Sequence, residues 1–245
     1  MGSFLYIMFS ILSWNIGLTK EWFRFLCMGR CSSKRRTLLK IIDKIRIYDK
    51  DLVCLQEIHQ DCADYLIRSL RTIYPHSVFY NDVGVCILSK YHMTLEKKHR
   101  FHKDFMATLL NCASGYIKVY LKNFDTYLYN IHLSCKYDYS NIEFMTLYAQ
   151  AITDNSKYCN TGLNVNNFIV GDYNFYRSQY LDMCSTYDIH PCIENKENSF
   201  NLLCNVNLDY MTKLSRYADK NNVFKELQVK VLKTYESDHF PITNI

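Results

Sequence analysis

Polar side chains that could bind a metal ion or activate water follow a short apolar run near residue 170. The run at residues 168–170, "FIV", ends in Gly171, and Asp172 and Asn174 follow it two positions apart. A β-branched apolar run of this kind predicts a buried strand. Residues i and i+2 beyond such a strand can point the same way, into the region where α/β proteins place their chemistry. Taken alone, the segment fits equally well a glycine turn whose Asx side chains hydrogen-bond their own backbone.

Other strand-like runs also end in residues suited to acid–base or metal chemistry. They are Asn15 in "ILSWNIG", Glu57 in "LVCLQEIH", His132 in "LYNIHLS", Asp209 in "VNLDYMT", and Asp238 and His239 in "YESDHFPI". Each has an ordinary structural explanation as well: a turn former, a solvated helix start, a hydrogen-bonded strand histidine, an edge charge or an Asx turn before Pro241. Six such coincidences in one chain favour a common site at the strand ends.

The elements that must position these residues are visible in the hydrophobic periodicity. A strand is predicted from Phe4 to Ile16, and apolar spacing predicts a helix up to Tyr48 with Ser32 or Ser33 as its N-cap. Further predicted elements are strands at "LVCLQE", "HSVFY" and "VGVCILS", a helix at "DCADYLIRSLRTIY", a hairpin turning near residues 123–125, a helix at about 141–155, a short helix near "QYLDMCSTY", and strands at "NLDYMTKL", "FKELQVKVL" and "FPITNI". Hairpins and crossovers together predict an α/β sandwich of mixed sheets with helices outside.

The composition is that of one globular domain spanning residues 1–245. The chain is 49% apolar and contains only seven glycines and three prolines, with no linker-like tract. Its 11 cysteines include no C-x-x-C pair, and those at Cys54 and Cys86 sit in apolar runs as small hydrophobes. Without a cleavable signal or an N-glycosylation acceptor, an intracellular, cytoplasmic monomer is expected. The run "FLYIMFSIL" is too short to span a bilayer, so no transmembrane segment is expected.

Taken in order, the polar motifs resemble those of a known enzyme family. The series "SWNIG", "LQE", "GVCILSK", "IHL", "GDYN", "LDY" and "SDHFPI" is similar to that of the endonuclease/exonuclease/phosphatase superfamily, which has the DNase I-like fold. It extends from Asn15 to Pro241 in the family's order. "LQE" alone carries no weight, whereas the complete series is specific.

The resemblance implies a four-layer sandwich of two face-to-face mixed β-sheets flanked by helices, with a cleft over the strand ends. It implies that Glu57 binds Mg2+ with Asn15 nearby, and that Asp172 and Asn174 position water and hold phosphate. His132 would act on the leaving-group side. Asp209 would orient His239, and Asp238 would complete the metal or histidine network.

This assignment agrees with the chemistry of a phosphodiesterase. Phosphodiester hydrolysis requires neutralisation of an anionic transition state, an aligned water and a proton for the departing oxygen. Mg2+ prefers one or two carboxylates together with phosphate oxygens, and Mn2+ could replace it. A carboxylate beside a histidine keeps the imidazole oriented and charged near neutral pH.

The substrate is less clearly indicated. The net charge of +5 suits a polyanion, and basic residues follow predicted strand ends, where they could hold a nucleic-acid backbone or simply face solvent. These residues are Lys34, Arg35, Arg36, Lys97, Lys98 and Arg100. The motifs "GVCILSKY" and "HLSCKYDY" instead resemble neutral sphingomyelinases, although Lys136 stands where those enzymes carry an acid. Nucleic acid is therefore the first expected substrate, a choline phospholipid at a membrane surface the second, and a catalytically inactive binding module the third reading.

Overall fold

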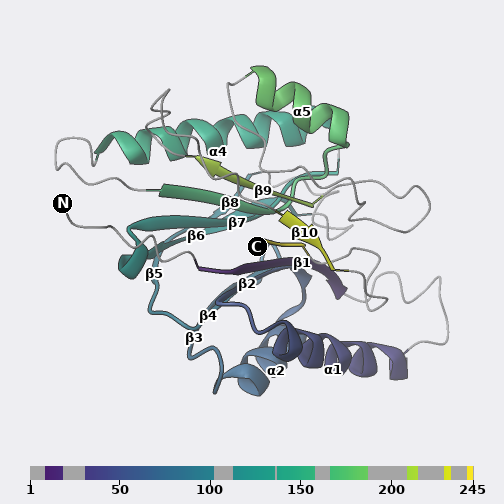
Figure 1. The fold of residues 1–245 in the computed structure, drawn as a ribbon. Helices are drawn as coiled ribbons and strands as arrows, with labels where there is room; N and C mark the ends of the chain where they lie inside the picture. Colours follow the sequence, from purple (N-terminus) through teal and green to yellow (C-terminus); the bar gives the residue numbers. More distant parts are fainter. Residues whose placement is uncertain are drawn as a thin grey trace.

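The computed structural model describes residues 9–18, 31–101, 113–135, 137–157, 166–186, 209–214, 229–232 and 242–244. Two mixed β-sheets pack face to face, and helices cover both outer faces (Figure 1). This arrangement confirms the predicted four-layer sandwich. Among the described residues, no helix is both long and apolar enough to cross a membrane.

The first sheet has six strands and is covered by two helices. Its order is β10 (Val229–Val231), β11 (Ile242–Asn244), β1 (Ile11–Leu18), β2 (Leu52–Ile58), β4 (Val85–Ser89) and β3 (His76–Tyr80). β1 and β2 run parallel, whereas the other neighbours pair antiparallel. Helices α1 (Cys31–Tyr48) and α2 (Gln60–Leu70) lie on the outer face of this sheet (Figure 1).

The second sheet has five strands and also contains one parallel pair. Its order is β5 (Thr94–Arg100), β6 (Gly115–Leu121), β7 (Thr126–His132), β8 (Asn166–Asp172) and β9 (Asp209–Leu214). A short 3-10 turn, η2 (Lys122–Phe124), joins β6 to β7 where the hairpin was predicted to turn. β7 and β8 are parallel and connected through α4 (Tyr137–Lys157), and α5 (Arg177–Thr186) follows β8.

The layer between the two sheets changes character along the strands. Near the beginnings of β1, β2, β7 and β8 it is apolar, with Ile11, Leu52, Leu128 and Phe168 in one cluster. Alternation places polar residues on the same face further along these strands. They are Ser13, Gln56, Asn130, Asn15, His132 and Asp172, and all are buried. The strands therefore bury apolar side chains at one end and bring polar side chains together at the other.

Two buried cysteines support the reading of these residues as small hydrophobes. Cys54 and Cys86 are fully buried free thiols in β2 and β4. Burial raises the pKa of the Cys86 thiol to about 12. It also raises the pKa of Cys54, with the neighbouring Cys86 as a smaller cause. Neither thiol is ionised near neutral pH, so neither is a nucleophile.

Several predicted boundaries are wrong. The first strand begins at Ile11 in the described residues and continues to Leu18, beyond the predicted end at Ile16, because a bulge extends its pairing with β2. Helix α1 begins at Cys31, so Ser32 and Ser33 lie inside its first turn and not at the N-cap. Helix α4 begins four residues earlier than predicted, at Tyr137.

The segment 94–100 is a strand that was not predicted from the sequence. β5 pairs antiparallel with β6 and forms an edge of the second sheet. Its residues from Thr94 to Lys98 are all exposed. An edge strand with two solvated faces has no apolar alternation, which is why the sequence pattern gave no strand signal here.

Candidate active site

The register of the strands brings the predicted site residues of the described strands to one end of the sandwich. In the second sheet, His132 on β7 lies beside Asp172 on β8, and Asp172 lies opposite Asp209 on β9. In the first sheet, Asn15 on β1 pairs with Gln56 on β2. Because both parallel pairs end at this edge and the sheets pack face to face, four strands supply side chains to one site.

Glu57 reaches the site because its backbone departs from the regular strand. Strict alternation after Gln56 would point Glu57 toward the helices. Its φ is instead +54°, in the left-handed region that a non-glycine residue rarely adopts. The register shifts by one residue between Asn15 and Leu18, where Gly17 also has a positive φ of 59°. This bulge turns the carboxylate inward, as bulges beside active sites commonly do.

The glycine that ends the "FIVG" run has a steric explanation. A Cβ at Gly171 would lie 2.1 Å from the carbonyl oxygen of Ile131 on β7, and its φ is +139°. Only glycine permits this approach of β8 to β7. The close contact immediately precedes the pair formed by His132 and Asp172.

The amide of Asn15 holds the two carboxylates together. Its Nδ2 donates to Glu57 Oε1 at 2.9 Å and to Asp172 Oδ2 at 2.8 Å. Its Oδ1 accepts from the backbone N–H of Gly17 at 3.1 Å, which fixes the orientation of the amide. Asn15 and Asp172 are buried, whereas the Glu57 side chain is 31% exposed. The site therefore has a buried side and a solvent-accessible side.

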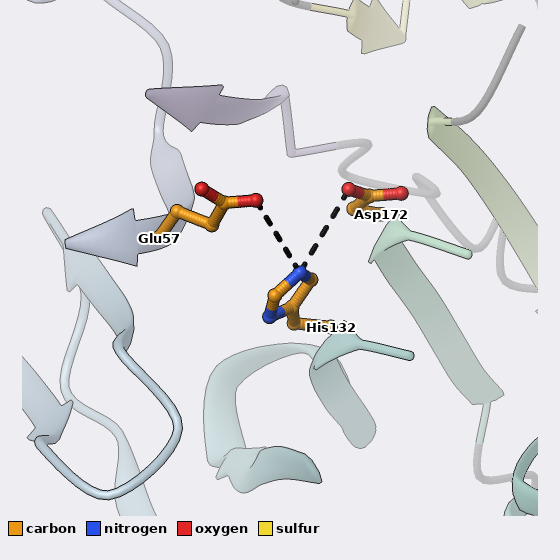
Figure 2. Close-up of side chains that lie close together, drawn as sticks. All are labelled: Glu57, His132 and Asp172. Atoms are coloured by element: carbon orange, nitrogen blue, oxygen red, sulfur yellow. Dashed lines mark ion pairs between the residues drawn. The ribbon is translucent and has the colours of Figure 1, made fainter. Parts of the chain in front are cut away.

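His132 faces both carboxylates with the same ring nitrogen. Its Nε2 lies 3.6 Å from Glu57 Oε1 and 4.0 Å from Asp172 Oδ2 (Figure 2). Its Nδ1 is buried and has no hydrogen-bond partner among the described residues. The imidazole is thus placed for electrostatic contact with the carboxylates.

Asp172 and Asn174 also organise the loops above the strand ends. Asp172 Oδ1 accepts from the backbone N–H of Asn174 at 2.8 Å, so the predicted Asx turn exists alongside the site. Asn174 has a φ of +53°, and its Nδ2 donates to the carbonyl of Leu133 at 2.7 Å. The loop after β8 is thereby tied to the loop after β7.

The donor set is suited to a divalent cation. One oxygen each from Glu57 and Asp172 and one nitrogen of His132 lie within 4.8 Å of one another. Two carboxylates and nearby solvent fit a hard cation such as Mg2+ or Mn2+. Two anionic groups beside one another favour the binding of a cation between them.

The remaining predicted residues divide into two groups. Asp209 lies in the described backbone, at the site edge, while Asp238 and His239 lie outside the described residues. Arg35 and Arg36 are exposed on α1, Lys97 and Lys98 are exposed on β5, and Arg100 is half-buried. Lys34 belongs to α1, but its side chain lies outside the described part of the chain.

Two buried amides beneath the site were not predicted from sequence. Gln56 Nε2 donates to Asn130 Oδ1 at 2.7 Å across the space between the sheets. The available signal was polarity at positions 56 and 130 on the inward face of apolar strands. The prediction considered only the more reactive residue in each strand, Glu57 in place of Gln56 and His132 in place of Asn130.

Comparison with known proteins agrees with the fold. A model of the Endonuclease/Exonuclease/phosphatase family matches residues 12–179. The chain belongs to this family, whose members are phosphoester hydrolases. No curated protein sequence matches the chain.

Solved structures share the architecture at low sequence identity. SmcL superposes with a TM-score of 0.72 at 18% identity, covering 96% of this chain and 98% of that one. Mannosyl-6-phosphatase from Bacteroides thetaiotaomicron VPI-5482 gives 0.67 at 15% identity, covering 97% and 99%. Sphingomyelinase C from Streptomyces griseocarneus gives 0.66 at 16% identity, covering 96% and 98%. At these identities the likeness establishes the fold, and the substrate must be inferred from the site.

Proposed function

We propose that this protein is a Mg2+-dependent phosphodiesterase, with Mn2+ able to substitute, and that nucleic acid is its substrate. The observation that carries the proposal is the cluster of Glu57, His132 and Asp172 at the end of the sandwich, bridged by Asn15. Membership of a phosphoester hydrolase family supports the reaction class. The donor chemistry of the cluster supports the metal.

Each residue of the cluster has a chemical task in this proposal. A bound divalent ion would neutralise charge on the phosphate. Glu57 holds the ion, and Asn15 orients its carboxylate. Asp172 aligns the attacking water, with Asn174 beside it to hold phosphate. His132 delivers a proton to the departing oxygen.

The aspartates and the histidine near the end of the chain complete the proposed site. The register places Asp209 directly opposite Asp172, at the edge where the cluster lies. In our proposal Asp209 orients His239, whose protonated ring donates to the phosphate oxygens in the transition state. Asp238 supports the metal or the histidine network.

The positive edge strand supports a nucleic-acid substrate. Lys97 and Lys98 are exposed on β5, and neither forms an ion pair with a carboxylate among the described residues. Arg100 is the last residue of β5. It pairs with Gly115 on β6, which in turn pairs with His132 on β7. Burial, with a smaller contribution from Lys97, lowers the pKa of His99. The lysines and Arg100 therefore provide the charge of this edge, which leads toward the site.

A choline phospholipid is the second candidate, because apolar side chains are exposed just after the strands that carry the site. Tyr139 and Ile142 in the first turns of α4 and Tyr176 ahead of α5 are 47%, 59% and 55% exposed. Side chains of this kind favour a membrane interface. The sandwich of Streptomyces griseocarneus sphingomyelinase C has the same fold.

A substrate panel tests the proposal. Duplex DNA, single-stranded DNA, RNA and sphingomyelin micelles are incubated with the protein in Mg2+, in Mn2+ and in EDTA. We expect metal-dependent cleavage of nucleic acid and none in EDTA. Cleavage of sphingomyelin alone would favour the second candidate, and inactivity on every substrate would favour a binding module. Metal-independent hydrolysis would contradict the assigned cofactor.

A further inference from the structure

A buried pair of side-chain amides joins the two sheets one layer beneath the candidate site. Gln56 on β2 and Asn130 on β7 are both fully buried, and the Gln56 amide nitrogen donates to the Asn130 oxygen at 2.7 Å. Gln56 directly precedes Glu57 in the chain. Asn130 precedes His132 by two residues and faces the same side of β7. A hydrogen bond between side chains therefore connects the two strands that carry the carboxylate and the imidazole.

The pair also bonds to the backbone of the first sheet. Asn130 Nδ2 donates to the carbonyl of Leu55 on β2 at 3.0 Å and to that of Cys86 on β4 at 2.8 Å. Gln56 Nε2 lies 3.3 Å from Ser13 Oγ on β1. The Asn130 amide uses both N–H hydrogens and its oxygen, so its orientation is fixed. We call Gln56 and Asn130 with these bonds the amide bridge.

Stability alone does not account for the amide bridge. Gln56 Oε1 is buried and has no hydrogen-bond partner among the described residues, which is unfavourable for folding. Nearer the beginnings of the same strands, Leu52 and Leu128 fill the space between the sheets with apolar side chains. Apolar residues at positions 56 and 130 could continue that packing. Replacing both amides would leave neither member of the Gln56–Asn130 bond unpaired, and the remaining cost would be the donor lost by the carbonyls of Leu55 and Cys86.

We propose that the amide bridge is a positioning device that sets the separation of Glu57 and His132 across the two sheets. The inference rests on the proposed function, in which these side chains serve the metal and the leaving group. Glu57 has a left-handed backbone conformation and its side chain is partly exposed, so packing alone does not fix the position of its carboxylate. The Gln56 side chain anchors the residue that precedes this turn, and Asn130 anchors the strand that carries His132. A misplacement of about 1 Å in such a site can cost about a hundredfold in rate.

The test combines apolar replacements of similar shape with three measurements. Gln56→Met, Asn130→Leu and the double variant are compared with the wild type in thermal unfolding of the metal-free protein. Mn2+ affinity is measured by electron paramagnetic resonance without substrate, and kcat and KM are measured with Mg2+ on a synthetic aryl phosphodiester. We expect the double variant to fold with a Tm at or above that of Asn130→Leu, because the double variant no longer buries a Gln56 amide that has lost its Asn130 partner. Its Mn2+ affinity and kcat should fall about 10- to 100-fold with little change in KM.

A control on the same strand separates positioning from general damage. Thr126 lies at the opposite end of β7, is buried, and donates its hydroxyl to the carbonyl of Phe124 at 2.8 Å. Thr126→Val should lower the Tm and leave kcat and Mn2+ affinity unchanged.

Each outcome decides the inference. A folded double variant with wild-type Mn2+ affinity and kcat overturns it, as does a loss in the double variant that only follows its loss of Tm. If the wild type hydrolyses no phosphoester but the double variant binds Mn2+ more weakly than the wild type does, the proposed function fails and the positioning role stands. A wild type that binds no Mn2+ overturns both.

Discussion

The two site carboxylates are held close together by one side-chain amide. Glu57 and Asp172 both accept from the Asn15 amide, whose oxygen is bonded to the Gly17 N–H. Two carboxylates on one amide retain a mutual repulsion that a divalent ion would relieve. In this arrangement Asn15 acts as a hydrogen-bond donor that aligns the carboxylates.

Removing the charge of Glu57 tests its role as the principal metal ligand. Glu57→Gln keeps the size of the side chain and should leave folding nearly intact. The Mg2+ concentration for half-maximal activity should rise sharply, and turnover at saturating substrate should fall by at least ~10²-fold. A Mg2+ titration of activity measures both effects. Normal activity across the titration would remove Glu57 from the site.

The proposed partnership of Asp209 and His239 is tested by a double-mutant cycle. Asp209→Asn and His239→Ala should each lower kcat/KM by similar factors. The double variant should lose little more than either single variant, because the two residues act as one unit. Strictly additive losses would show that they act independently, and the dyad would be abandoned.

Strand β8 approaches β7 closely at Gly171. Gly171→Ala would place a methyl group 2.1 Å from the Ile131 carbonyl in addition to its backbone strain. We expect a loss of more than ~3 kcal/mol in the free energy of unfolding, measured in urea. Gly84→Ala is the matched control, because its φ is also positive but its nearest contact is 3.2 Å. It should cost about 1–2 kcal/mol. Equal losses would show that the close approach is not what requires glycine at position 171.

The sequence was sufficient to predict which strands end in polar groups, because this pattern depends only on residues adjacent in the chain. Buried runs such as "FIVG" and "LVCLQE" predict inner strands, and the polar residues that end them are recognised because the residues before them are apolar. β5 was missed because its exposed side chains have no apolar alternation. The inward turn of Glu57 depends on a left-handed backbone and a bulge against β1, which only the paired strands reveal. The amide bridge likewise depends on which strands of the two sheets face one another.

For the protein as a whole, cation binding should be coupled to folding. A ligand that binds only the native state stabilises it by about 2.7 kcal/mol at 100 times its Kd. For a chain of this size, that corresponds to a rise in Tm of about 5–10 °C. Thermal unfolding in EDTA and in saturating Mg2+ measures the shift. Glu57→Gln should abolish it, and an equal shift in this variant would place the stabilising cation elsewhere.

Along the central strands the packing between the two sheets changes from apolar at one end to polar at the other. Around Ile11, Leu52 and Leu128 the sheets adhere through apolar contact, whereas around Asn15, Glu57 and His132 they meet through a few directional bonds and two like charges. Local opening requires the least free energy where apolar contact is sparse. Amide hydrogens near Glu57 should therefore exchange with solvent through small openings that leave those near Leu52 protected. In such openings the sheets would separate at the edge of the candidate site while the opposite, apolar edge keeps them aligned, so that closure restores the same geometry.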